Sequence, residues 1–266
     1  MVSTAFSISI LRATAEPMDN SEKKDRYSLI DAIRATAVVN MIIYHLCYDI
    51  FCVFGIYPAF NCAIGAVIWE RAICCTFIIV SGVSLNFTSH GYRRGIILNL
   101  CGFAITVISV LLMPSQAIWF GVLNLLGCAM LIGFALRDLL MKISPVVGMA
   151  ILGTIYALLY GVPYGYIGLF GYRLFSLPDW MYGCKYLAYI GLPSADFVSA
   201  DYFPIIPWIF LYLFGFFLWR AITEKGWDKG FRRKIPALDF IGRHSLLIYL
   251  AHQPLLYGAC WLLLHK

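Results

Sequence analysis

One apolar segment, residues 27–51, carries four ionisable side chains that an α-helix would place on one face. They are Asp31, Arg34, His45 and Asp49. Arg34 and His45 are eleven residues apart, so a helix brings them within about 20° of each other and separates them by ~16 Å along its axis. A charge in hydrocarbon costs at least ~2.5 kcal/mol, so such residues usually face a polar cavity. We therefore expect the functional chemistry along this face.

His45 can take up and return a proton near neutral pH, and Asp49, one turn later, can orient the ring or stabilise the imidazolium. Arg34 can bind an anionic group such as a phosphate through parallel N–H donors. Each residue also has a plainer interpretation, His45 as an interfacial side chain and Arg34 as an interfacial cation paired with Asp31. The alignment of the four groups favours a functional role for His45 and leaves both interpretations of Arg34 open.

A second polar stretch, residues 243–254, begins the last apolar segment of the chain. Its polar side chains are Arg243, Ser245, Tyr249, His252 and Gln253. A membrane helix this polar rarely faces lipid. We expect it to line the same cavity as residues 27–51.

Three further polar residues are predicted at the depth of His45, namely Arg71, Asn124 and Asp201. They could hold a polar acceptor. An interfacial ion pair, an interhelical hydrogen bond and a helix cap explain them equally well. Ser84, within a stretch of small residues, is interpreted as a packing position that lets helices approach.

The composition indicates an all-α integral membrane protein. The chain is 61% hydrophobic and 13% charged, against about a quarter charged residues in soluble proteins. Seven segments are long enough to span: 29–52, 66–88, 96–113, 119–136, 146–162, 204–220 and 244–263. A short or re-entrant eighth helix is possible within 178–192. The sequence predicts one membrane domain, residues 26–266, after a disordered tail at 1–25 whose true start could be Met18.

The basic residues predict the orientation of the spans. They are concentrated in the connectors 90–94, 137–142 and 220–234, whereas the connectors 53–65 and 114–118 hold none. Cytoplasmic loops are rich in Lys and Arg, so we expect a multi-pass cell-membrane protein with a cytoplasmic amino terminus. This distribution also explains the net charge of +6 without a nucleic-acid partner. The nine cysteines form no CxxC pair and are interpreted as buried hydrophobic residues.

Five segments of the chain resemble motifs of a known family. The segment 26–49, with Arg34, ten intervening residues and then His45, is similar to the first helix of the transmembrane acyltransferase superfamily. The motifs FIIVSGVS at 77–84, WFGVLNLLG at 119–127, DYFPIIPW at 201–208 and IGRHSLLIYLAHQP at 241–254 resemble its heparan-α-glucosaminide N-acetyltransferase-like branch. The chain departs from the family at Ala35, where Gly is usual, and at Asn124, where the branch would have His.

The resemblance implies a transmembrane acyltransferase-like bundle that uses cytosolic acetyl-CoA to acetylate a sugar on the far side of the bilayer. It implies that His45 is catalytic and Arg34 belongs to the donor site. The ~16 Å between them is close to the reach of an extended pantetheine arm. No metal is expected.

The predicted function is therefore an acetyl-CoA-dependent O- or N-acetyltransferase with a sugar or glycan acceptor. His45 and Asp49 are predicted to be catalytic. Donor binding is assigned to Arg34, Asp31, Arg243, Ser245, Tyr249 and His252, and acceptor binding to Asn124, Arg71 and Asp201. A proton-coupled transporter of small solutes is the main alternative, since intramembrane ionisable groups also form relays. A membrane scaffold is a third, and a homodimer is possible.

Overall fold

The computed structural model describes residues 27–169 and 172–264, and the predicted tail at 1–25 lies outside this part. Six described helices are long and apolar enough to cross a membrane: Ser28–Val53, Ile64–Phe87, Gly91–Leu112, Pro145–Tyr164, Ile205–Glu224 and Ser245–Leu264. A seventh apolar helix, α5 (Val122–Ala135), rises only about 21 Å, which is less than the hydrocarbon thickness. The prediction of an all-α membrane bundle of about seven spans is confirmed.

The helical elements follow the predicted segments closely. They are α2 (Ser28–Tyr48) with a π-helical end (Asp49–Val53), α3 (Ile64–Ser84), α4 (Gly91–Leu112), α5, α6 (Arg137–Leu140), α7 (Pro145–Leu159), α8 (Ile205–Glu224), α9 (Pro236–Arg243) and α10 (Ser245–Leu264). Short 3₁₀ helices occupy Pro58–Cys62, Leu85–Phe87, Pro114–Gln116, Val162–Tyr164 and Trp227–Arg232. The predicted span 119–136 is shortened because Phe120 has a positive φ of 56°, which excludes it from the helix.

The connector between α7 and α8 contains no eighth crossing among its described residues. Its helices, Asp179–Tyr182 and Lys185–Tyr189, are 3₁₀ turns too short to span a bilayer. Instead it contains an antiparallel hairpin that the sequence did not predict, formed by β1 (Tyr166–Leu169) and β2 (Tyr172–Ser176).

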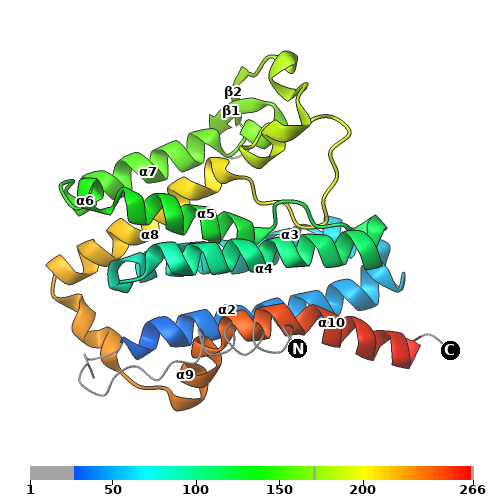
Figure 1. Ribbon diagram of the computed structural model, residues 1–266, viewed down its shortest axis with the longest axis horizontal. Coiled ribbons are helices and arrows are strands. Elements are labelled where there is room, and N and C mark those ends of the chain that lie inside the picture. The colour runs from blue at the N-terminus through cyan, green and yellow to red at the C-terminus, as the bar shows by residue number, and fades with distance from the viewer. Residues whose placement is uncertain (1–26, 170–171, 265–266) are drawn as a thin grey trace, which may run out of the picture.

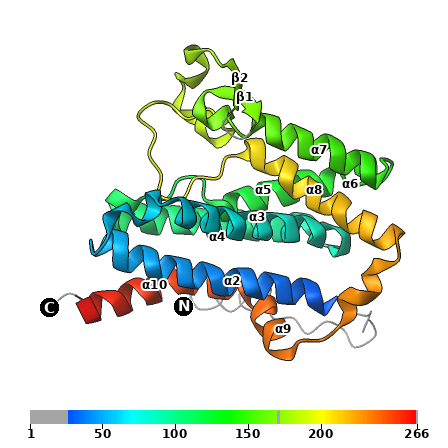
Figure 2. The same ribbon diagram turned by 180° about the vertical axis from the view of Figure 1, so that it is seen from behind.

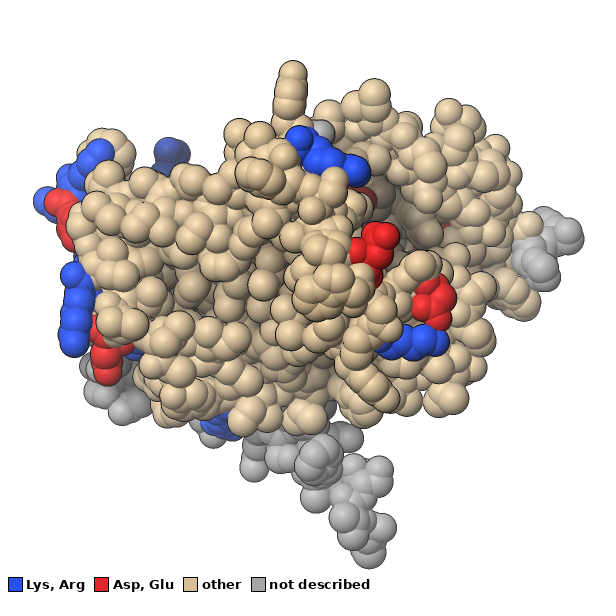
Figure 3. Space-filling view, turned by 90° about the horizontal axis from the view of Figure 1, so that it is seen from above, with Lys and Arg blue, Asp and Glu red and all other residues tan. Residues whose placement is uncertain are grey.

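The long helices lie side by side along the longest axis of the molecule (Figures 1 and 2). Helices α2, α9 and α10 form one side of the bundle, α3 and α4 lie in the middle, and α5, α7 and α8 form the other side, with the hairpin beyond α7. Lys and Arg side chains gather at the end where α2 begins and α8 ends (Figure 3).

The middle and far side of the bundle are held together by an apolar core around α8. Tyr212, Phe216 and Phe217 of α8 are almost fully buried in it. A Cβ at Gly82 of α3 would lie 1.8 Å from the carbonyl oxygen of Tyr212, and one at Gly215 of α8 would lie 2.2 Å from that of Ile79. Only glycine lets these two backbones approach so closely.

Candidate active site

Helices α2 and α10 run parallel and meet at three successive depths. At the first, Gly242, just before α10, lies against the backbone of Asp31, where an added Cβ would be 2.2 Å from the carbonyl oxygen. At the second, the rings of His45 and His252 face each other with centroids 4.9 Å apart. At the third, the Gln253 amide donates to Asp49. The two polar segments predicted to share a cavity therefore lie side by side.

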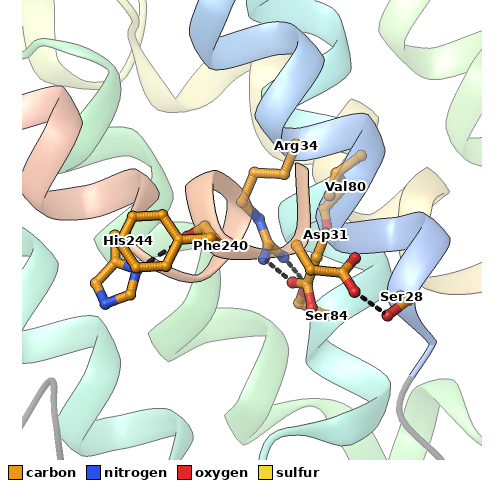
Figure 4. Close-up of polar contacts among 8 residues, drawn as sticks. Ser28, Asp31, Arg34, Val80, Ser84, Phe240 and His244 are labelled. Carbon is orange, nitrogen blue, oxygen red and sulfur yellow. Dashed lines mark hydrogen bonds and ion pairs between the residues drawn. The ribbon is translucent and has the colours of Figure 1, made fainter. Parts of the chain in front are cut away.

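Arg34 is held at the basic end of this interface by two neighbours (Figure 4). Its Nη1 donates to Asp31 Oδ1 at 2.9 Å, and its Nη2 donates to Ser84 Oγ of α3 at 2.7 Å. The Arg34 side chain keeps 22% of its surface exposed, so its guanidinium is held in place and still accessible. Ser84 was interpreted from sequence as a packing residue, and the structure corrects this: its hydroxyl positions Arg34.

The junction of α9 and α10 closes this end. Ser28 donates to the buried Asp239 of α9 at 2.6 Å, which ties the start of α2 to α9. Arg243, exposed at the end of α9, and Ser245, partly buried at the start of α10, follow within a turn of Gly242. The predicted donor residues Arg34, Asp31, Arg243 and Ser245 are thus brought to one end of the α2–α10 interface.

His45 and His252 lie deeper in the interface and are the central pair. His252 is buried, its Nδ1 is 2.5 Å from the Tyr249 carbonyl oxygen, and its ring also packs on that of Tyr249 at 5.4 Å. A carbonyl can only accept a hydrogen bond, so Nδ1 carries the proton and Nε2 is an acceptor. In the described part of the chain Nε2 of His252 has no hydrogen-bond partner. His252 therefore offers a bare imidazole nitrogen inside the bundle, next to the ring of His45.

The expected contact between Asp49 and the His45 ring is not made. Asp49, fully buried at the π-helical end of α2, accepts a hydrogen bond from Gln253 Nε2 at 2.8 Å. Its second oxygen and Gln253 Oε1 have no partner among the described residues. The i+4 spacing holds for a regular helix, but here Asp49 begins the π-helical end and faces α10. His252 takes the place beside His45 that the sequence assigned to Asp49.

Arg71 lines a second polar feature, a small pocket on the hairpin side of α3. About 270 Å³ of empty space, part of it open to solvent, lies between its walls, which are formed by Tyr160, Pro163, Tyr164, Tyr202, Pro204, Pro207 and Trp208. The Arg71 guanidinium lies 5.8 Å from the centre of the Trp208 ring. Aromatic walls with one cation can bind a polar ring-shaped ligand. Sequence reasoning missed these walls because they come from three separate segments.

Asp201 lies near this pocket, in the connector before α8. Its Oδ2 accepts a hydrogen bond from the Val122 N–H at the start of α5, at 3.3 Å. Burial raises the pKa of Asp201 to about 6, while the Val122 hydrogen bond and Arg71 act in the opposite direction. Asp201 therefore caps α5, as the helix-cap interpretation of the sequence expected. Its carboxyl changes charge near pH 6.

Asn124 is not brought to either feature. Its side chain packs against Gly102 of α4, where an added Cβ would lie 2.5 Å from the amide oxygen. It fills the α4–α5 contact, so it lies between two helices. The interhelical hydrogen bond considered from sequence stays a prediction. Among the described residues no three His, Cys, Asp or Glu side chains form a group that could hold a metal ion.

Comparison with known proteins gives one match. The family described as "Heparan-alpha-glucosaminide N-acetyltransferase, catalytic" matches residues 26–254, most of the chain. No curated protein and no solved structure matches. The matched range includes α2, the Arg71 pocket and the first half of α10, and so contains every residue of the candidate site.

Proposed function

The chain belongs to the heparan-alpha-glucosaminide N-acetyltransferase catalytic family, and on that premise we propose that it transfers an acetyl group from acetyl-CoA to a sugar or glycan. Its long apolar helices make it a multi-pass membrane protein. The acceptor group is a hydroxyl or an amine. Donor and acceptor approach from opposite sides of the cell membrane.

The observation that carries the proposal is the pairing of the partly buried His45 with the buried His252, set between parallel helices and about 16 Å along α2 from an anchored arginine. A histidine is the usual group for moving a proton at neutral pH. The separation is close to the length of an extended pantetheine arm. An arm of this length can join a phosphate-binding end to a reacting thioester at the histidines.

Donor binding is assigned to the basic end. Arg34, positioned by Asp31 and Ser84, binds a phosphate of CoA, and Arg243 adds a second cation at the mouth. Ser245 and Tyr249 follow along α10 toward the histidines. Basic loop residues gather at this end, and by the positive-inside rule this supports our assignment of it to the cytoplasmic side.

Acceptor binding is assigned to the Arg71 pocket and Asp201. The ring of Trp208 and the neighbouring tyrosines offer flat apolar faces to a sugar ring, and Arg71 and Asp201 offer polar contacts to its substituents. Asn124 is left out of this assignment, because it packs against α4.

In the transfer step His45 acts as the general base. It takes the proton of the acceptor as the acceptor oxygen or nitrogen forms a bond to the acetyl carbonyl carbon. The carbon–sulfur bond breaks and its electron pair leaves with CoA. A positioned general base contributes about 10²- to 10⁴-fold to such a reaction.

The test is release of CoA from acetyl-CoA by the full-length protein in lipid nanodiscs, with glucosamine and a panel of neutral and acidic monosaccharides as acceptors. We expect release that depends on the acceptor, an acetylated product by mass spectrometry, and a higher unfolding temperature with CoA. If the protein neither releases CoA nor is stabilised by CoA, but takes up a solute together with protons, it is a transporter instead.

A further inference from the structure

We infer that His252 is a second catalytic residue, which receives the acceptor's proton from His45 and returns it to the sulfur of CoA. This inference rests on the proposed acetyl transfer. It moves His252 out of the donor-binding set and gives it a chemical role of its own. It also replaces Asp49 as the partner of His45.

The position of His252 is the first argument. Its ring lies 4.9 Å, centre to centre, from that of His45, and the two rings are inclined by 56°. His45 belongs to α2 and His252 to α10, so the pair joins two helices rather than two turns of one helix. Small rotations of either side chain bring a nitrogen of one ring to a nitrogen of the other.

The state of the His252 ring is the second argument. Nδ1 is committed to the Tyr249 carbonyl oxygen, which fixes the proton on that nitrogen and leaves Nε2 with a free lone pair. Nε2 is buried, and no described group donates to it. A buried acceptor normally has a donor, because leaving it unmatched costs about 1–3 kcal/mol. A proton delivered from His45 would supply the missing partner.

The path of the donor is the third argument. Arg243, Ser245 and Tyr249 lead along α10 to His252, and seven residues of helix from Ser245 to His252 rise about 10 Å. A thioester carried along α10 from the basic end therefore arrives at His252. His45 lies across the interface, on α2. His252 is thus placed at the leaving sulfur, and His45 faces His252 from α2.

The reaction balances without another reactant. The acceptor's O–H or N–H proton goes to His45 as the new bond to the acetyl carbon forms, and the thioester carbon–sulfur bond breaks to give CoA thiolate. The proton then passes from His45 to His252 Nε2 and from there to the thiolate. Both histidines return to their neutral forms, and the products are the acetylated acceptor and CoA.

The decisive variant is His252→Asn. The amide NH₂ of Asn can still donate to the Tyr249 carbonyl as Nδ1 does, but Asn has no equivalent of the Nε2 lone pair. If His252 only holds the backbone, this variant keeps wild-type kcat. If His252 relays the proton, kcat falls at least tenfold while the KM for acetyl-CoA stays within about twofold. His252→Gln, which lacks a titratable nitrogen, is expected to lose a similar factor.

A matched control is available about two helix turns before His252. His244 also has Nδ1 close to a backbone carbonyl, that of Phe240 at 2.9 Å, but it is exposed and packs on Phe240 rather than on His45. Figure 4 shows it beside Phe240, apart from Arg34. His244→Gln is expected to leave kcat unchanged.

The wild-type enzyme provides a test that needs no variant. Both histidines must be neutral before the acceptor's proton moves, so the ascending limb in the pH dependence of kcat should reflect two ionisations and have a slope approaching two. The other titratable groups next to the pair are Tyr44 beside His45, Asp49 bound to Gln253, and Tyr249 beside His252. Tyr249 in turn lies near Asp201 and Cys74. The slope should fall to one in His252→Asn, because only His45 then needs to be neutral. A slope of one in the wild type, or wild-type kcat in His252→Asn, overturns the relay.

The two proposals fail separately. If the wild-type protein shows no acceptor-dependent CoA release, acetyl transfer itself is wrong, and the relay falls with it. If the wild type is active and His252→Asn matches it, only the relay is wrong, and His45 remains the base.

Discussion

The two sides of this bundle are built on opposite principles. Around α8, large apolar side chains are fully buried, and glycines bring α3 and α8 into backbone contact. Between α2, α9 and α10, four buried polar atoms lie without partners among the described residues: Asp49 Oδ2, Asp239 Oδ1, His252 Nε2 and Gln253 Oε1. On the α8 side the described residues include one such atom, the Tyr212 hydroxyl. Tyr249 packs against the apolar clusters of both sides and joins them.

The difference separates stability from chemistry. Close apolar packing gives the α3–α8 side a single rigid arrangement. Unmatched polar atoms cost stability on the α2–α10 side, and such costs are typical of sites that act on a ligand. The rigid side keeps the helices of the polar side in position. Substitutions should therefore destroy folding on one side and activity on the other.

The largest effect on stability is expected from Gly82→Ala on the rigid side. A Cβ at this position would overlap the Tyr212 carbonyl oxygen at 1.8 Å, so α3 and α8 must separate, at a cost of more than about 3 kcal/mol. The control is Gly258→Ala in α10, where nothing lies within 4 Å of an added Cβ. Unfolding temperatures in detergent measure both. Equal temperatures for the two variants would contradict the contrast between the sides.

The next largest effect is expected from Arg34→Ala on the polar side. Loss of a charge-assisted contact to phosphate costs about 1.5–3 kcal/mol, which corresponds to a rise of about 10- to 150-fold in the KM for acetyl-CoA. Arg34→Lys keeps the charge but not the planar pair of donors, so its KM should be intermediate. Initial rates across acetyl-CoA concentrations measure both. An unchanged KM in Arg34→Ala would remove Arg34 from the donor site.

A smaller effect is expected from Asp201→Asn and depends on pH. Burial raises the Asp201 pKa from its usual 3.8 to about 6. Between these values the folded protein holds a proton that the unfolded chain releases, so stability falls as pH rises through this window and stays lower above pH 6. Asn carries no charge and can still accept the Val122 N–H. The variant should match the wild type at pH 4 and be more stable at pH 8, by at most about 3 kcal/mol.

Unfolding temperatures at pH 4 and pH 8 give the sign of this effect. A variant less stable than the wild type at pH 8 would mean that the Asp201 carboxylate is stabilised by its neighbours, not penalised by burial.

The sequence predicted the faces of individual helices well and the contacts between helices poorly. The α2 stripe was predicted because periodicity specifies which residues share one face. Periodicity does not specify which helix that face meets, so the pairing of His45 with His252, rather than Asp49, became visible only in the structure. Asn124 has the depth expected for the acceptor site but faces Gly102 of α4. The π-helical end of α2 likewise breaks the regular spacing on which the Asp49 prediction depended.

The walls of the Arg71 pocket could not have been predicted for a related reason. Tyr160 directly follows α7, Tyr202 lies in a connector and Trp208 belongs to α8, and only their packing brings them around one guanidinium. The hairpin of β1 and β2 lies within a connector whose sequence suggested a short helix. In both cases the arrangement depends on contacts between distant segments, which one sequence does not encode in any local pattern.

The central claim is that His45, in the polar interface, performs the chemistry. His45→Gln preserves the approximate size of the side chain and removes the base. We predict that CoA release from acetyl-CoA in nanodiscs falls by about 10²- to 10⁴-fold, with the unfolding temperature and the stabilisation by CoA unchanged. A His45→Gln protein that acetylates at the wild-type rate would contradict the account.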